Sequence, residues 1–299
     1  MEMKPGIYGF KQTVLFALLA MFSYSFADAQ DHPNIIVIYT DDQGYGDVSA
    51  LNPESKFQTS HIDRIAAEGI IFSDGHCSAT SCSPSRYGLL TGRYSWRTSL
   101  KRGVLLADRE CLIEEGRTTL ATLCKRAGYQ TAMVGKWHLG MQYPGTKGDR
   151  DWSQPVTDGP NDKGFDYFFG LAASMNFGIL TYTENDHVTE IPSKWTDKKN
   201  DNDPYTDFRF TPPYDDKPVN ERSVEVAPSF RDDLALETLT LKAVQYINES
   251  AGDAHCGNPF FLYFAPTAPH LPHSVHPAFK GRSSIGKYGD FMLEIDHRV

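Results

Sequence analysis

Short apolar runs alternate along this chain with segments whose apolar residues recur at helical spacing. Continuous β-branched and aromatic runs are typical of strands buried on both faces of a sheet, and apolar residues three and four apart are typical of amphipathic helices. The pattern predicts strands at 34–39, 70–72, 131–134 and 260–264. It predicts helices at 59–68, from 82 onward, at 118–127, at 232–250 and from 287 onward. This alternation favours an α/β fold with a mainly parallel sheet.

The stretch from 142 to about 228 shows neither pattern and is rich in Pro, Gly, Asp, Asn and Tyr. Long stretches of this kind are usually functional loops or a disordered insertion. Its polar and aromatic residues could contact a sugar or an aryl group, or could only pack the loops together: Tyr182, Glu184, Asn185 and Trp195. We therefore assign no binding role to any one of them.

The first 29 residues have the three parts of a secretory signal. Lys4 and Lys11 make the start positive, 14–26 is mostly apolar, and Ala27-Asp28-Ala29 is a small-x-small cleavage site. The apolar part is shorter than the roughly 20 residues that span a bilayer. We therefore expect residues 1–29 to be a cleaved signal peptide, the protein to be exported to a periplasm or the extracellular space, and no stable insertion into a membrane.

Composition limits the remaining possibilities. Hydrophobic residues make up 40% of the chain, which is enough for one sizeable core within residues 30–299. The formal net charge of −9 argues against nucleic acid as a partner. A local basic cluster, which is either a solvated face or a guide for an anionic substrate, contains Arg86, Arg93, Arg97, Lys101 and Arg102.

The five cysteines leave their redox state open. They are Cys77, Cys82, Cys111, Cys124 and Cys256. If Cys82 is consumed by chemistry, the other four could form two disulfides by any of three pairings in an exported protein, or could all be free thiols. The sequence does not decide between these states.

The most distinctive segment is 82–93, with the sequence CSPSRYGLLTGR. Pro84 suits the first turn of a helix, so Cys82 is expected at a helix N-terminus, where free N–H groups and the helix dipole favour an anion. Arg86 lies one turn further on the same face, and its planar guanidinium matches a sulfate or phosphate. For an isolated pair, a buried cysteine with an unrelated surface arginine would be the usual meaning.

Polar residues also follow three of the predicted strands. Asp41 and Asp42 come after strand 34–39, at the edge where open α/β sheets bind ligands. Lys136 and His138 follow strand 131–134 and would point to the same side of an extended segment. His270 stands between prolines after strand 260–264. Alone, these would be a solvated turn, surface residues and a loop histidine. Where carboxylates do bind a metal, their hard oxygen atoms favour Ca²⁺ or Mg²⁺ over zinc.

Together these motifs resemble the sulfatase family. Segment 82–93 resembles its first signature, and 135–140 (GKWHLG) resembles its second. The resemblance implies an alkaline phosphatase-like αβα sandwich with a central, mainly parallel sheet. It also implies that a maturation enzyme oxidises Cys82 to formylglycine, whose hydrated aldehyde attacks the sulfur of a sulfate ester. The expected activity is sulfuric ester hydrolysis of the arylsulfatase type, on a sulfated small molecule or glycan.

The resemblance also implies roles for single residues. It implies that the divalent cation is bound by Asp41, Asp42 and Cys82. It implies that the catalytic residues are Cys82, Arg86, Lys136, His138 and His270. Among these, Arg86 and Lys136 would bind the sulfate, His138 would handle the proton of the formylglycine hydroxyl, and His270 would protonate the leaving oxygen.

The chain covers only the N-terminal portion of the family's pattern. In the family, a further strand with an Asp-Asn pair of cation ligands, a sulfate-binding lysine and a smaller C-terminal domain follow this portion. We therefore expect residues 30–299 to be the N-terminal part of a truncated sulfatase catalytic domain, with weak or no activity by itself and an exposed sheet edge. The alternatives are a phosphonate or phosphate monoester hydrolase of the same superfamily, and an inactive remnant that only binds sulfated ligands.

Overall fold

The protein is represented by a computed structural model that describes residues 32–197 and 210–299. The predicted signal peptide at 1–29 lies outside the described residues. Within the described ranges, every helix is too short or too polar to cross a membrane.

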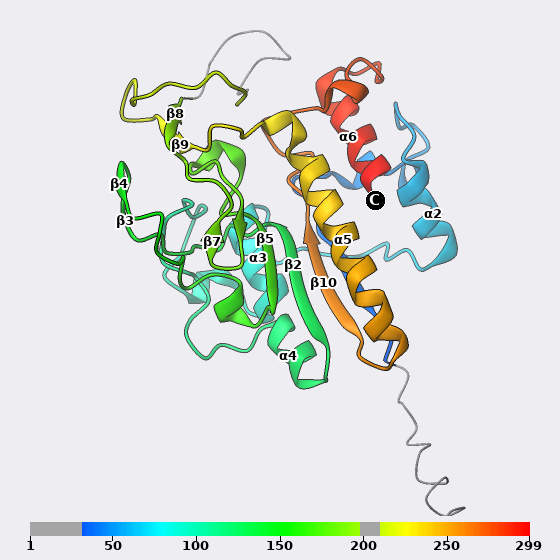
Figure 1. Cartoon of the computed structure of the whole chain (residues 1–299). Helices are drawn as coiled ribbons and strands as arrows, with labels where there is room; N and C mark the ends of the chain where they lie inside the picture. Colours follow the sequence, from blue (N-terminus) through cyan, green and yellow to red (C-terminus); the bar gives the residue numbers. More distant parts are fainter. Residues whose placement is uncertain (1–31, 198–209) are drawn as a thin grey trace, which may run out of the picture.

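A six-stranded sheet forms the centre of the molecule (Figure 1). In spatial order its strands are β1 (Ile35–Ile38), β10 (Phe260–Ala265), β2 (Gln130–Lys136), β5 (Tyr167–Leu171), β6 (Thr183–Glu184) and β7 (His187–Val188). The first four strands are parallel to one another. β6 pairs antiparallel with β5, and β7 pairs antiparallel with β6. The strands predicted at 34–39, 131–134 and 260–264 are thus confirmed as β1, β2 and β10.

Helices cover both faces of the sheet. α5 (Ala235–His255) lies across one face, while α3 (Cys82–Thr91) and α4 (Leu120–Arg126) lie on the other (Figure 1). Alternate residues of β2 point to opposite faces, so each helical layer has its own core. Ala132 and Val134 pack with residues of α5, and Met133 belongs to the core that contains residues of α3 and α4. The molecule is therefore a three-layered α/β sandwich, and the helices predicted to start at 82, 118 and 232 are confirmed.

Two further helices lie side by side beyond β1 (Figure 1). They are α2 (Ser60–Glu68) and α6 (Lys287–Arg298), close to the predicted bounds. The Asp296 carboxylate of α6 accepts hydrogen bonds from the backbone N–H groups of His61 at 3.0 Å and Ile62 at 2.9 Å. These donors belong to the first turn of α2 and have no partner inside their own helix. The last helix of the described chain, α6, is therefore hydrogen-bonded to the N-terminal turn of α2.

The strand predicted at 70–72 is wrong. These residues form no strand, and Ile70, Ile71 and Phe72 are all exposed. Side chains of this kind favour a strand only where a neighbouring strand and a core are present to pack against. Here the segment runs over the surface, where no described strand pairs with it.

The stretch from 142 to 228 contains more structure than the sequence indicates. It includes β5, a buried central strand, besides β6 and β7. It also contains two small antiparallel pairs, formed by β3 (Gly145–Thr146) with β4 (Asp149–Arg150) and by β8 (Lys194–Thr196) with β9 (Val224–Val226).

Short 3₁₀ helices are distributed along the whole described chain. They occur at Tyr45–Asp47, Ser49–Leu51, Ser95–Arg97, Asn161–Lys163, Met175–Phe177, Asp232–Leu234 and Pro277–Phe279.

β1 forms one edge of the central sheet. No described strand pairs with its outer side, and Ile36 and Ile38 are exposed on one face. The predicted exposed sheet edge is therefore confirmed for the described residues. An uncovered edge with apolar side chains is a surface to which another strand can add.

Candidate active site

The predicted site residues meet at the carboxyl ends of β1, β10 and β2. Asp41 follows β1, Lys136 is the last residue of β2, and His270 follows β10. The backbone N–H of Asp41 donates to the carbonyl of Ala268 at 2.9 Å, which extends the pairing of β1 and β10 beyond the strands. Parallel strands bring their carboxyl ends to one edge of a sheet, so residues far apart in sequence come together there.

α3 begins at this edge with Cys82 as its first residue and Ser81 as its N-cap. Pro84 lies in the first turn, where its missing N–H breaks no hydrogen bond of the helix. Arg86 lies one turn further and is almost completely buried. The prediction that Cys82 stands at a helix N-terminus is confirmed, and the free N–H groups of this turn favour an anion nearby.

Asp41, Arg86 and Lys136 form a buried charged triad. Arg86 Nη2 lies 3.1 Å from Asp41 Oδ1, and Lys136 Nζ lies 2.5 Å from Asp41 Oδ2. Burial alone would raise the pKa of Asp41, but the charges of Arg86 and Lys136 outweigh it and hold this pKa well below its usual range. Burial lowers the pKa of Lys136, and Asp41 opposes this effect. With all three groups charged, two cations face one carboxylate and one positive charge remains.

Arg86 is held in place from several sides. Its Nη1 donates to the backbone oxygen of Lys136 at 2.9 Å and to the Tyr263 hydroxyl at 3.4 Å, and its guanidinium lies 5.6 Å from the centre of the Tyr39 ring. Its Nε is buried and has no hydrogen-bond partner among the described residues. Because an unpaired buried donor is costly, this N–H favours a ligand that brings an oxygen atom.

His138 is buried beside Lys136, but the predicted extended geometry is wrong. β2 ends at Lys136, and His138 has a φ of 58°, in the left-handed region. Its Nε2 lies 2.9 Å from the carbonyl oxygen of Leu105. A carbonyl can only accept, so Nε2 carries the hydrogen, and Nδ1 is buried with no partner in the described part of the chain. Burial, followed by the charge of Lys136, lowers the pKa of His138 to about 2, so the ring is neutral.

His270 and Asp42 lie at the outer side of the triad. His270 Nε2 is 3.5 Å from Asp42 Oδ2. Asp42 has a φ of 65°, and its side chain is 56% exposed. The candidate ligand atoms of Asp41, Cys82 and His270 all lie within 4.8 Å of one another. Two of the three predicted metal ligands, Asp41 and Cys82, therefore come together with His270, while Asp42 stands next to this group and contacts His270.

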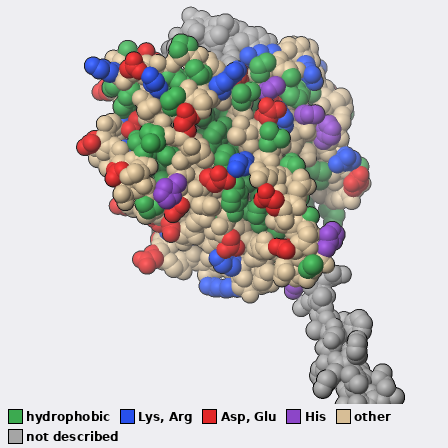
Figure 2. Space-filling view, viewed as in Figure 1, with side chains coloured by type: hydrophobic (Ala, Val, Ile, Leu, Met, Phe, Trp, Pro, Cys, Tyr) green, Lys and Arg blue, Asp and Glu red, His purple; other side chains and the backbone are tan. Residues whose placement is uncertain are grey.

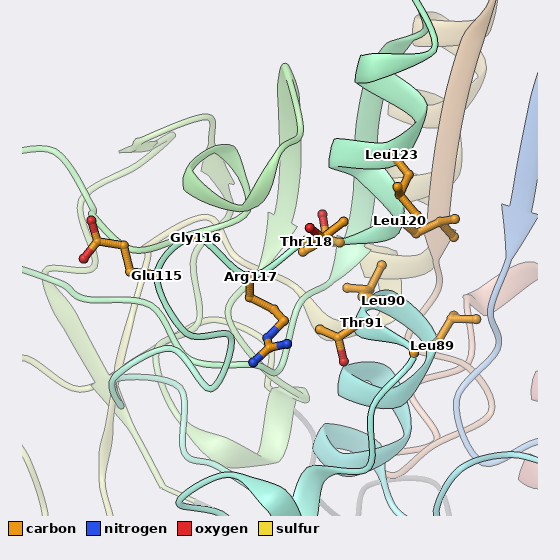
Figure 3. Close-up of a pocket in the computed structure, with 11 residues that line it drawn as sticks. Leu89, Leu90, Thr91, Glu115, Gly116, Arg117, Thr118, Leu120 and Leu123 are labelled. Carbon is orange, nitrogen blue, oxygen red and sulfur yellow. The ribbon is translucent and has the colours of Figure 1, made fainter.

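A cavity of about 490 Å³ opens onto part of this group, although Lys136, His138 and His270 are not among its lining residues. Its lining includes Asp41, Asp42, Cys82, Ser85 and Arg86, together with the loop at 75–81. A second cavity of about 560 Å³ lies between the end of α3 and the start of α4 (Figure 3). It is lined by leucines, threonines and Arg117 and contains none of the predicted site residues. The first cavity is therefore the candidate active site.

The sequence analysis missed Ser174, which follows β5. Its hydroxyl is buried and has no hydrogen-bond partner among the described residues. The next turn places the Phe177 ring 5.1 Å from the His138 ring, so this loop passes beside the site. The signal would have been a polar residue after a core strand, but it could not be recognised because β5 was not predicted.

The basic cluster predicted on the surface is divided in the structure. Arg86 belongs to the buried triad, and Arg93 forms an ion pair with Glu114. The guanidinium of Arg97 lies 5.2 Å from the centre of the Trp96 ring. On the face shown in Figure 2, which is the face of α5, acidic and basic side chains are interspersed. The predicted cluster is therefore not one continuous solvated basic face, because Arg86 is buried and Arg93 is paired.

All five cysteines are free thiols in the structure. Cys77 and Cys256 are exposed, and Cys124 is buried. Burial raises the pKa of the Cys111 thiol to about 12 and also raises the pKa of Cys82. Unmodified Cys82 is therefore a neutral thiol and a poor nucleophile.

Fold and site together define an α/β protein with a buried, charged site at the carboxyl edge of its sheet. The sequence matches the Sulfatase family over residues 33–299. The chain belongs to the sulfatase family.

Individual relatives agree with this assignment. An N-acetylgalactosamine-6-O-sulfatase of Bacteroides thetaiotaomicron is 33% identical, over 89% of this chain and 54% of that protein. Arylsulfatase G of Rattus norvegicus is 33% identical, over 93% of this chain and 49% of that protein. A solved structure from work on glycosaminoglycan metabolism by Bacteroides thetaiotaomicron superimposes with a TM-score of 0.74 and 31% identity, over 90% of this chain and 58% of that one. The alkaline phosphatase-like fold is thus confirmed, and the chain spans about half the length of the curated relatives it matches.

Proposed function

We propose that this protein hydrolyses sulfate esters, as an arylsulfatase-type sulfatase with a formylglycine at position 82 and a divalent cation. The observation that carries this proposal is the buried triad of Asp41, Arg86 and Lys136 beside the N-terminus of α3. Its net positive charge and the unpaired Nε–H of Arg86 suit the oxygens of a sulfate group. The relatives named above are sulfatases, which favours sulfate over phosphate or phosphonate monoesters.

The donor set fits a small hard cation. Asp41 and residue 82, with Asp42 beside them, would hold Ca²⁺ or Mg²⁺, and His270 lies within reach of the same position. A bound cation would polarise the sulfate and favour a deprotonated hydroxyl on residue 82. Oxidation of Cys82 to formylglycine, by a maturation enzyme of the host, would replace a neutral thiol with such a hydroxyl on the hydrated aldehyde.

The residues of this chain then divide the remaining work. Arg86 and Lys136 orient the sulfate and spread the negative charge that develops on its oxygens. His270 stands at the outer side of the site and donates a proton to the departing alcohol or phenol. His138, neutral and with Nδ1 unpaired, accepts the proton of the remaining hydroxyl so that sulfate can leave.

The substrate we propose is a sulfated small molecule or glycan. One named relative acts on N-acetylgalactosamine 6-O-sulfate and another is an arylsulfatase, so both substrate classes belong in the first screen. Export to a periplasm or the extracellular space would give the protein access to such molecules.

The test is sulfate release by the matured protein, purified from its own host. An aryl sulfate, a 6-O-sulfated N-acetylgalactosamine and the matching phosphate esters are compared, and mass spectrometry measures the aldehyde at position 82. We expect sulfate esters to be preferred, and Cys82→Ala to lower the rate by at least about 1,000-fold. Cys124→Ala, which changes a buried cysteine on α4, is the matched control and should retain activity.

Two results would overturn the proposal. Faster hydrolysis of the phosphate esters would indicate the related phosphomonoesterase activity. Binding of sulfated ligands without sulfate release, unchanged by Cys82→Ala, would indicate a remnant that only binds them.

A further inference from the structure

Ser83, the residue after Cys82, has a contact that the proposed mechanism does not use. It is the second residue of α3 and is completely buried. Its Oγ accepts a hydrogen bond from the backbone N–H of Leu105 at 3.1 Å. The hydroxyl therefore connects the N-terminal turn of α3 to a loop 22 residues further along the chain.

The same loop residue contacts His138. The carbonyl oxygen of Leu105 lies 2.9 Å from Nε2 of His138 and fixes the hydrogen on that nitrogen. Without this acceptor, a neutral imidazole could place its hydrogen on either nitrogen, and only one of these tautomers leaves Nδ1 able to accept a proton. Ser83 and His138 are thus the two ends of one hydrogen-bonded chain, with both backbone groups of Leu105 in the middle.

We propose that Ser83 is a positioning residue, which holds Leu105 so that its carbonyl keeps His138 in the Nε2–H tautomer with Nδ1 free to accept a proton. The role of the tautomer in turnover rests on the proposed function, whereas the tautomer itself can be measured without it. Ser83, which adjoins residue 82 on α3, would thereby determine the tautomer of His138, which lies in the loop after β2.

The first test separates turnover from substrate binding. Rates are measured for Ser83→Ala and Ser83→Thr and divided by the fraction of residue 82 that mass spectrometry finds as aldehyde, because Ser83 adjoins the maturation site. We expect Ser83→Ala to lower kcat per aldehyde by at least about tenfold, part of the roughly 10²- to 10⁴-fold that acid–base catalysis supplies, with KM changed less than about twofold. Ser83→Thr keeps a hydroxyl at this position and should therefore retain most of the kcat of the starting protein.

Ser223→Ala is the matched control. The Ser223 hydroxyl is equally buried and also accepts backbone N–H bonds, from Val219 at 3.0 Å and Asn220 at 3.2 Å. This variant loses the same kind of contact without any connection to His138, so kcat per aldehyde should stay within about twofold of the starting protein. An equal loss of kcat in Ser223→Ala and Ser83→Ala would overturn the proposal.

The second test does not depend on catalysis. ¹⁵N NMR of the histidine-labelled full-length protein, with Cys82 unconverted, reports which ring nitrogen carries the hydrogen, and His138→Gln assigns the signal. We expect the Nε2–H tautomer in the starting protein and a shift toward the other tautomer in Ser83→Ala. An unchanged His138 signal in Ser83→Ala, or an Nδ1–H tautomer at the outset, would refute the positioning role, whether or not the protein releases sulfate.

Discussion

Asp41→Asn removes the carboxylate that both Arg86 and Lys136 contact. The three side chains are 4%, 1% and 0% exposed, so little solvent screens the two cations that remain. At 3.1 Å and an effective dielectric constant of about 20, one such pair is worth about 5 kcal/mol before desolvation is counted. Breaking a buried pair typically costs about 3–5 kcal/mol, because the remaining charge stays buried without compensation. We therefore expect Asp41→Asn to lower the free energy of unfolding by about 3 kcal/mol or more.

Urea unfolding at pH 7 measures this loss, with a chelator present so that a bound cation does not add to the stability of the folded state. Adding Lys136→Met to Asp41→Asn should recover at least about 1 kcal/mol, because methionine keeps the apolar chain and removes a charge that lacks its partner. Arg64→Ala is the control, since the Arg64–Glu68 pair is 67% and 75% exposed and should contribute no more than about 0.5 kcal/mol. A loss below about 1 kcal/mol in Asp41→Asn would refute the view that the triad is a buried, ionised cluster.

Two further predictions concern α6. Burial raises the pKa of Glu294 from 4.5 to about 7, although its carboxylate accepts the His276 N–H at 2.8 Å. Between pH 4.5 and 7 the folded protein therefore keeps a proton that the unfolded chain has released. As the pH rises through this window, the contribution of Glu294 to the free energy of unfolding falls by up to about 1.4 kcal/mol for each pH unit. Glu294→Gln should raise the urea midpoint at pH 7.5 more than at pH 5, and an effect of equal size at both would contradict this assignment. Asp296→Ala leaves the N–H groups of His61 and Ile62 without their acceptor and should cost about 1–2 kcal/mol in the same assay; a cost below about 0.5 kcal/mol would show that water replaces the contact.

The central elements could be predicted because each sequence follows the simple apolar pattern of its own type of element. β1 and β10 are continuous apolar runs, and α5 has the apolar spacing of a helix that covers a sheet. β5 could not be recognised in the same way, since it contains a glycine and stands within a stretch rich in turn residues. Its glycine is required by packing: a Cβ at Gly170 would lie 1.8 Å from the backbone oxygen of Gly135 on β2. The residue that weakens the strand signal is thus the one that lets β5 approach the strand carrying Lys136.

Positions in the site were predictable from the motifs, but their environments were not. Asp41 and Asp42 have the same side chain and adjacent positions, yet one is buried between two cations and the other is mostly exposed beside His270. The difference arises from Arg86 on α3 and Lys136 on β2, which the sequence cannot place relative to β1. The charges of Arg86 and Lys136 hold the pKa of Asp41 well below its usual range, so Asp41 is ionised at neutral pH. Asp42 lacks these contacts: its backbone is in the left-handed region, and its side chain lines the cavity beside His270, an environment that its identity to Asp41 does not reveal.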